Sequence, residues 1–87
     1  MEEKVGMIVR SRAGHDKGRF MVITALEGDF AFVADGKERK LEKPKKKRLK
    51  HLAVTKTVIA MSNLTDKGLR RRLREFAEKG SPETENS

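Results

Sequence analysis

The sequence predicts a mainly β domain, a small barrel or rolled sheet of four to five short strands followed by one C-terminal α-helix. Three observations predict this class. Short β-prone apolar segments alternate with glycine-containing turns through the first part of the chain. Near the C-terminus the apolar residues recur at helical spacing instead. The length of 87 residues is that of one domain, which we divide into a β body at 1–60, a helix at 61–80 and a disordered tail at 81–87.

The first three strands are expected at residues 5–11, 19–27 and 30–34. All three segments are rich in Val, Ile, Phe and Met, and the turn signals Gly28-Asp29 and Asp35-Gly36 follow the second and the third. The second strand is apolar on both faces, which favours a strand that curls around a core. Alternation along it places on one face Phe20, Val22 and Leu26.

The later strands are less regular in sequence. A fourth strand is expected at residues 45–52, with Leu49 and Leu52 turned inward, and Pro44 before it belongs in a loop or on an edge because it has no N–H to donate. The apolar run at 57–62 predicts a short closing strand.

The helix is marked at both ends. Thr65 is a good N-cap, and Asp66 in the first turn suits the helix dipole. Gly80 and Pro82 end the helix. Apolar residues recur at helical spacing at Leu69, Leu73, Phe76 and Ala77, and we expect Leu69, Leu73 and Phe76 to pack on the β body.

The composition is strongly basic. There are 21 Lys and Arg against 13 Asp and Glu, for a net charge of +8, and a chain with this balance attracts polyanions such as nucleic acid. Cysteine is absent, which excludes disulfides and thiol chemistry and fits a reducing cytoplasm. The sequence has no apolar stretch of membrane-spanning length, so we expect no membrane partner.

The loop between the first two strands is the first candidate site. Two glycines in it allow left-handed backbone, and successive N–H groups there are expected to form an anion-binding nest. The alternative is a plain turn with solvated charges. The candidate RNA-binding residues of this loop and its flanks are Arg10, Arg12, Gly14, His15, Asp16, Lys17, Gly18 and Arg19.

The second and third candidates are a basic run and the helix. Residues 37–50 hold nine Lys or Arg against Glu38 and Glu42, a local charge of +7 that a phosphate backbone would neutralise. The alternatives are a solvated basic stretch and, for the helix, local ion pairs or a membrane surface. The candidate residues are Lys43, Lys45, Lys46, Lys47, Arg48, Lys50, His51, Arg70, Arg71 and Arg74.

Catalysis and base stacking have little support. His15 and His51 have no ligand-like spacing, and no catalytic constellation or phosphate loop is present, so we expect no enzyme activity, no metal, no cofactor and no small-molecule substrate. Trp and Tyr are absent, and most of the four Phe are expected inside the small core. That leaves recognition of phosphate and shape, which suits folded RNA.

The segment "GMIVRSRAGHDKGRFMVI", residues 6–23, resembles the KOW motif. The residues Gly14-His15-Asp16-Lys17-Gly18 match its Gly-x-Asp-x-Gly loop, and apolar residues flank the loop on both sides. Residues 33–55 are similar to the later strands of short bacterial KOW proteins and of a large-subunit ribosomal protein of the L-fourteen-e type. KOW domains are small SH3-like barrels of ribosomal proteins and transcription elongation factors, so the resemblance implies an SH3-like barrel whose loop contacts RNA.

The sequence as a whole therefore predicts a monomeric cytoplasmic protein that binds structured RNA. We expect that RNA to be ribosomal RNA of the large subunit, with the protein part of the ribosome or associated with it. Two alternatives stay open. One is an adaptor of the transcription or translation machinery whose groove receives a peptide, and the other is a non-specific DNA-binding protein.

Overall fold

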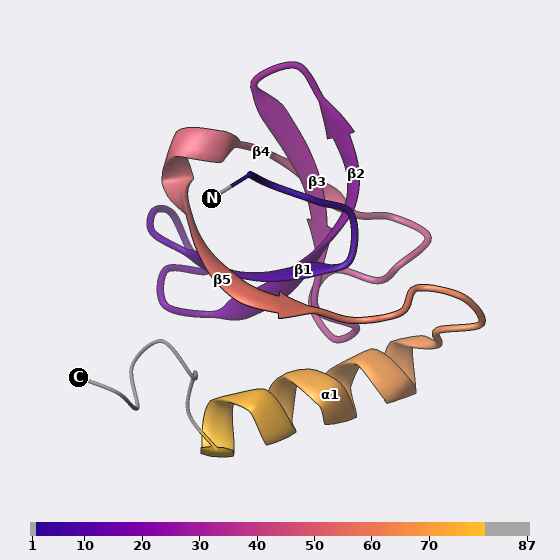
Figure 1. Ribbon diagram of the computed structural model, residues 1–87. Helices are drawn as coiled ribbons and strands as arrows, with labels where there is room; N and C mark the ends of the chain where they lie inside the picture. Colours follow the sequence, from indigo (N-terminus) through magenta and orange to yellow (C-terminus); the bar gives the residue numbers. More distant parts are fainter. Residues whose placement is uncertain (1, 80–87) are drawn as a thin grey trace.

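The computed structural model describes residues 2–79. The predicted tail at 81–87, together with Gly80 and Pro82, lies outside the described residues. One curled antiparallel sheet in the order β4-β3-β2-β1-β5 is followed by a helix (Figure 1). This confirms the mainly β class with a C-terminal helix. The elements are β1 (Met7–Ser11), β2 (Phe20–Glu27), β3 (Phe30–Ala34), β4 (Lys45–Arg48), the 3₁₀ turn η1 (Leu49–His51), β5 (Leu52–Val58) and α1 (Asp66–Lys79).

The sheet curls but does not close. Its edge strands β4 and β5 follow one another in the chain through η1, and within residues 2–79 no strand pairing joins them. The structure therefore has the rolled-sheet form, and the closed SH3-like barrel that the sequence and its resemblance favour is not confirmed. No helix in this described part of the chain is both long and apolar enough to cross a bilayer.

The end of the sheet differs from the prediction. The fourth strand stops at Arg48 because the chain turns through η1, where the Leu49 N–H donates to the Asp29 carbonyl oxygen at 2.8 Å. The closing strand predicted at 57–62 is wrong, since β5 spans Leu52–Val58. The physical reason is pairing, because Leu52 lies opposite Ser11 of β1 and Val58 opposite Met7, so β5 has used the whole free edge of β1 by residue 58.

A bulge in β2 changes which residues share a face. The pairing with β3 shifts between Ile23 and Ala25, so that both Val22 and Ala25 lie on the face of Ala34 and Phe32. Leu26 then falls on the opposite face from Val22, which contradicts strict alternation. The Leu26 side chain is at the exposed end of the hairpin, and 40% of the residue surface is open to solvent.

The core has two parts, one on each side of the sheet. The inner part lies within the curl and contains Met7, Val9, Met21, Ile23, Ala31, Val33 and Leu52, with Leu49 and Val54 packed against it. The outer part lies under α1 and contains Ile8, Val22, Ala34, Ile59, Leu69 and Leu73. The basic run is therefore anchored, since its leucines at 49 and 52 reach the inner core as predicted.

Helix α1 packs as its sequence predicts. Thr65 caps it, because the Gly68 N–H donates to the Thr65 hydroxyl at 3.0 Å. Leu69 and Leu73 are buried, and the Phe76 ring meets the Phe20 ring of β2 edge-on at 5.2 Å between centroids. The helix consequently lies along the outer side of the curled sheet (Figure 1).

Candidate nucleic-acid interface

The glycine loop, residues 12–18, is braced by a buried ion pair with β4. The Lys47 ammonium lies 2.7 Å from a carboxylate oxygen of Asp16 and donates to the Ser11 hydroxyl at 2.7 Å and to the Ala13 carbonyl at 3.0 Å. The Lys47 and Asp16 side chains are only 6% and 12% exposed. Burial raises the pKa of the Asp16 carboxyl, but hydrogen bonds from Lys47 and Ser11 outweigh it and hold that pKa below its ordinary value. The pair fixes the loop against the sheet.

Three amides of the loop cannot contribute to the anion-binding nest that its glycines predict. Gly14 and Gly18 have left-handed φ angles of 84° and 89°, as expected. However, the three successive N–H groups of residues 17–19 donate to carbonyl oxygens within residues 11–16, at 2.7 to 3.2 Å. These three amides are satisfied inside the protein and are not available to an external anion. The exposed cationic or polar side chains are those of Arg12, His15 and Lys17.

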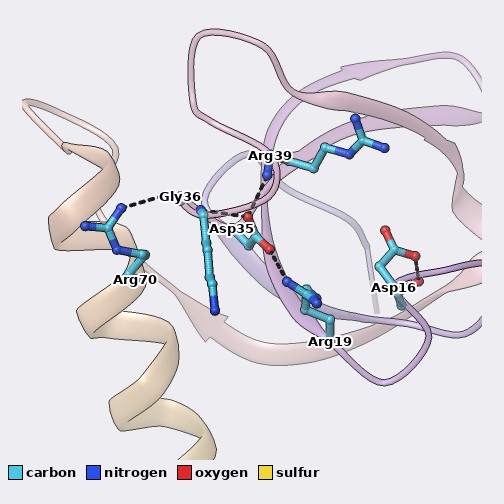
Figure 2. A network of polar contacts seen from close by, with 8 residues as sticks. Asp16, Arg19, Asp35, Gly36, Arg39 and Arg70 are labelled. Atoms are coloured by element: carbon cyan, nitrogen blue, oxygen red, sulfur yellow. Dashed lines mark hydrogen bonds and ion pairs between the residues drawn. The ribbon is translucent and has the colours of Figure 1, made fainter.

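Asp35 organises the turn after β3. Its buried carboxylate accepts hydrogen bonds from the Lys37 and Arg39 backbone N–H groups, at 2.9 and 2.8 Å, and from the Arg19 guanidinium at 3.1 Å (Figure 2). Burial raises the pKa of the Asp35 carboxyl, but the two backbone hydrogen bonds and Arg19 outweigh it and hold the pKa below its ordinary value. These contacts fix the turn, and the lysines that follow it, Lys37 and Lys40, are exposed to solvent.

Helix α1 is fastened to this same turn. The Arg70 guanidinium donates to the Gly36 carbonyl oxygen at 2.7 Å (Figure 2), and the Leu41 N–H donates to the Asp66 carboxylate at 2.7 Å. Gly36 has a φ of 80°, and a Cβ atom there would overlap the Asp66 carbonyl oxygen. Glycine is required at position 36 both for its backbone angle and for this close approach of helix and turn.

The turn and the helix together enclose a basic cleft of about 590 Å³. Its floor is apolar, from Phe20, Leu73 and Ala77. The one carboxylate among its lining residues, Asp35, is buried and already paired. The cationic side chains come from three separate parts of the chain and are Arg19, Lys37, Lys40, Arg70 and Arg74.

A second basic groove runs beside the glycine loop. It is lined by Arg10, Arg12 and Lys17, and its volume is about 420 Å³. The Arg10 guanidinium lies 5.7 Å from the centre of the Phe20 ring, and Phe20 also lines the cleft. The groove and the cleft are therefore joined across one aromatic ring. We refer to the two together as the basic surface.

The candidate residues on β4 alternate between the two faces of the sheet, so they do not all face solvent. Lys46 and Arg48 are exposed and Lys45 is half-buried, whereas Lys47 points into the protein. The prediction that Lys47 contacts phosphate does not fit its position, because its ammonium already has three partners. Asp16 is likewise a brace for the loop and not a group that faces a ligand.

The remaining candidates are spread around the molecule. Lys43 and Lys50 are exposed, and the carbonyl of the half-buried His51 accepts a hydrogen bond from the Arg12 N–H at 2.8 Å. Arg71 is exposed on the helix, 3.9 Å from Glu75, and borders a second hollow on α1 that Arg70 and Arg74 also line.

The sequence-based set lacks two cations and one aromatic residue that line the basic surface: Lys37, Lys40 and Phe20. The two lysines belong to the basic run, so its charge was the available signal, but only the docking of α1 brings them to the cleft.

In the described part of the chain, no group of three His, Asp or Glu side chains is placed to hold a metal ion.

The phenylalanines are not inside the core, contrary to the prediction. All four are partly exposed. Phe20 and Phe76 lie between the sheet and α1, whereas Phe30 and Phe32 lie on β3 and pack against neither core cluster. The inner face of β3 carries the smaller side chains Ala31 and Val33, and these fill the inner core in place of the rings.

Comparison of the chain with protein-family models found no match, and comparison with curated proteins likewise found none.

Proposed function

We propose that this protein binds structured RNA through the phosphates that the basic surface would contact. The observation that carries the proposal is the convergence on one cleft of five cationic side chains from three separate parts of the chain. Like charges at close range repel one another, and an arrangement that gathers them is favoured when a polyanion neutralises them. An RNA backbone is such a polyanion, and its neutralisation releases condensed counterions.

The geometry supports phosphate recognition over small-molecule chemistry. The cleft is open, its polar groups are cations with planar or flexible heads, and Arg is suited to paired hydrogen bonds with phosphate oxygens. The resemblance of residues 6–23 to the KOW motif adds a second, independent line of support, since it implies an SH3-like barrel with an RNA-contacting loop. On that resemblance we propose ribosomal RNA of the large subunit as the target, in the cytoplasm.

Binding to folded RNA fragments in rising salt tests the proposal. With roughly five to seven phosphate contacts, the logarithm of the affinity should fall with the logarithm of the salt concentration with a slope of about −4 to −6. A flat salt response would refute phosphate-driven binding. Equal affinity for duplex DNA would instead favour the non-specific DNA-binding alternative. Salt-resistant binding to a protein, with no RNA recovered after crosslinking, would favour the adaptor alternative.

A matched pair of helix variants locates the site. Arg74 lines both the cleft and the second hollow on α1, whereas Arg72, two residues earlier on the same helix, is exposed and lines neither. Arg74→Gln should weaken RNA binding several-fold and make the salt slope shallower by about one, and Arg72→Gln should change neither appreciably. If both variants weaken binding equally, the cleft is not the site. Co-sedimentation with large ribosomal subunits at moderate salt then tests the ribosomal target.

A further inference from the structure

Two partly exposed aromatic rings lie on the outer face of the sheet and do not belong to the core cluster under α1. The register of β3 places Phe30 opposite Arg48 and Phe32 opposite Lys46. Ala25 and Glu27 of β2 lie across from the same rings, so all these side chains share one face. Both phenylalanines are partly exposed and belong to neither core cluster. They account for half of the four aromatic residues of the chain, and packing of the core does not explain them.

Cations lie over these rings. The Lys46 ammonium is 4.6 Å from the centre of the Phe30 ring and 5.9 Å from that of Phe32, and the Arg48 guanidinium is 5.1 Å from the Phe30 centre. The Lys46 ammonium also lies 3.1 Å from a carboxylate oxygen of Glu27. Both side chains are at the surface, with 48% of Lys46 and 66% of Glu27 exposed. These heads sit on long flexible stems at the surface, so they can move to a ligand without disturbing the sheet.

We propose that Phe30 and Phe32 form a stacking platform for an unpaired nucleobase, with Lys46 and Arg48 binding the phosphates on either side of it. This inference rests on the proposed RNA binding and makes its target more specific, namely folded RNA that displays a single-stranded loop or bulge. An aromatic face accepts any base by stacking, and cations beside the rings match the charge of the flanking backbone. An apolar protein segment would instead bring no negative charge to these cations.

The experiment compares two RNAs of equal phosphate number, a hairpin with an unpaired loop and a fully paired duplex. Affinities of the full chain are measured by fluorescence anisotropy at fixed salt for the unmodified protein, Phe30→Leu and Phe32→Leu. Each variant should bind the hairpin at least about fivefold more weakly, while its affinity for the duplex stays within about twofold. Phe30→Tyr, which keeps the ring beside the exposed turn at residues 28–29, should bind the hairpin as the unmodified protein does.

A charge variant gives the matched contrast. Lys46→Gln with Arg48→Gln keeps both rings but removes the cations, so it should weaken binding to both RNAs and make the salt slope shallower, whereas the Leu variants should leave the slope unchanged. A base analogue such as 2-aminopurine placed in the hairpin loop should lose fluorescence on binding to the unmodified protein and not on binding to the Leu variants. Far-UV circular dichroism verifies that each variant is folded.

The outcomes separate the two proposals. If the unmodified protein binds neither RNA, the proposed function fails. If it binds both RNAs and the Leu variants bind them equally well, or lose affinity for hairpin and duplex alike, the stacking platform is refuted while RNA binding stands. Recovery of a protein partner that is lost in the Leu variants, with hairpin binding unchanged, would also refute the platform and would assign this face to the adaptor alternative.

Discussion

Replacing Lys47 by methionine removes the ammonium that joins β4 to the glycine loop and keeps a side chain of similar length. The buried Asp16 carboxylate would then retain only the Ser11 hydroxyl as a side-chain donor, and the Ala13 carbonyl would lose its partner from Lys47. Because both charged side chains are nearly excluded from solvent, water can replace the ammonium only if the loop moves outward. The expected result is a large loss of stability together with local loosening of residues 12–18.

The size of the expected loss in unfolding free energy follows from the burial of the ion pair. Removing one partner of a buried ion pair costs about 3 to 5 kcal/mol, and we take the lower end, about 3 kcal/mol, because Asp16 lies on a surface loop. A chain of 87 residues has a total unfolding free energy of roughly 4 to 13 kcal/mol, so this is a large fraction of it. The corresponding fall in melting temperature is roughly 12 to 24 °C. Asp16→Asn combined with Lys47→Met should cost clearly less than the two single changes added together.

Urea unfolding followed by far-UV circular dichroism measures the unfolding free energy of Lys47→Met, since the chain has no Trp or Tyr to report by fluorescence. Lys46→Met is the matched control, because Lys46 is the neighbouring lysine of β4 but is exposed, and its ion pair with Glu27 is at the surface. The control should lose no more than about 1 kcal/mol. If Lys47→Met costs less than about 1 kcal/mol, or no more than the control, the ion pair does not hold the loop.

Two further predictions concern pH and the helix contact. The pKa values of Asp16 and Asp35 are held below their ordinary value of 3.8, so the stability that they contribute is fully present above pH 3.8 and is lost as the pH falls through the lower folded-state values. Urea midpoints should therefore fall steeply below about pH 4, and Asp35→Asn should flatten that fall; an unchanged pH profile in this variant would contradict the assignment. Gly36→Ala should cost at least about 2 kcal/mol, because it adds overlap with the Asp66 carbonyl to left-handed strain. Gly28→Ala, with a φ of 57° and open space around it, should cost only about 1 kcal/mol, and equal losses in the two variants would refute the close approach.

The elements that the sequence predicts best are those whose ends are marked by turn or capping residues. The turns at Gly28 and Asp35-Gly36 bound β3 at residues 30–34 as expected, and Thr65 caps α1 as expected. The strand after Pro44 is different, because residues 45–48 are four consecutive basic residues. A segment of identical character has no alternation, so nothing in it indicates that Lys47 faces inward. That choice is made by pairing with β3, which sets the register from a distance.

The candidate site divides in the same way. The exposed loop and its left-handed glycines follow from the residues at 14–18, which fix their own local backbone. The cleft could not be predicted, because it depends on a close approach between Gly36 and α1, thirty residues apart in sequence, and on the inward turn of the Asp35 carboxylate. The bulge at residues 23–25 carries no glycine to mark it, and it decides that Ala25 lies beside Phe32 on the outer face.

The carboxylates near the basic surface position its cations more than they neutralise them. Asp16 holds the loop through the buried Lys47, Asp35 holds the N–H groups of residues 37 and 39, and Asp66 holds the Leu41 N–H. Among the cations of the cleft, only Arg19 is paired with one of these carboxylates. Ordering of loops and side chains opposes binding, so a surface whose loops are fixed beforehand loses less entropy when a polyanion binds. These acidic residues would therefore favour RNA binding through geometry, although their charge alone would oppose it.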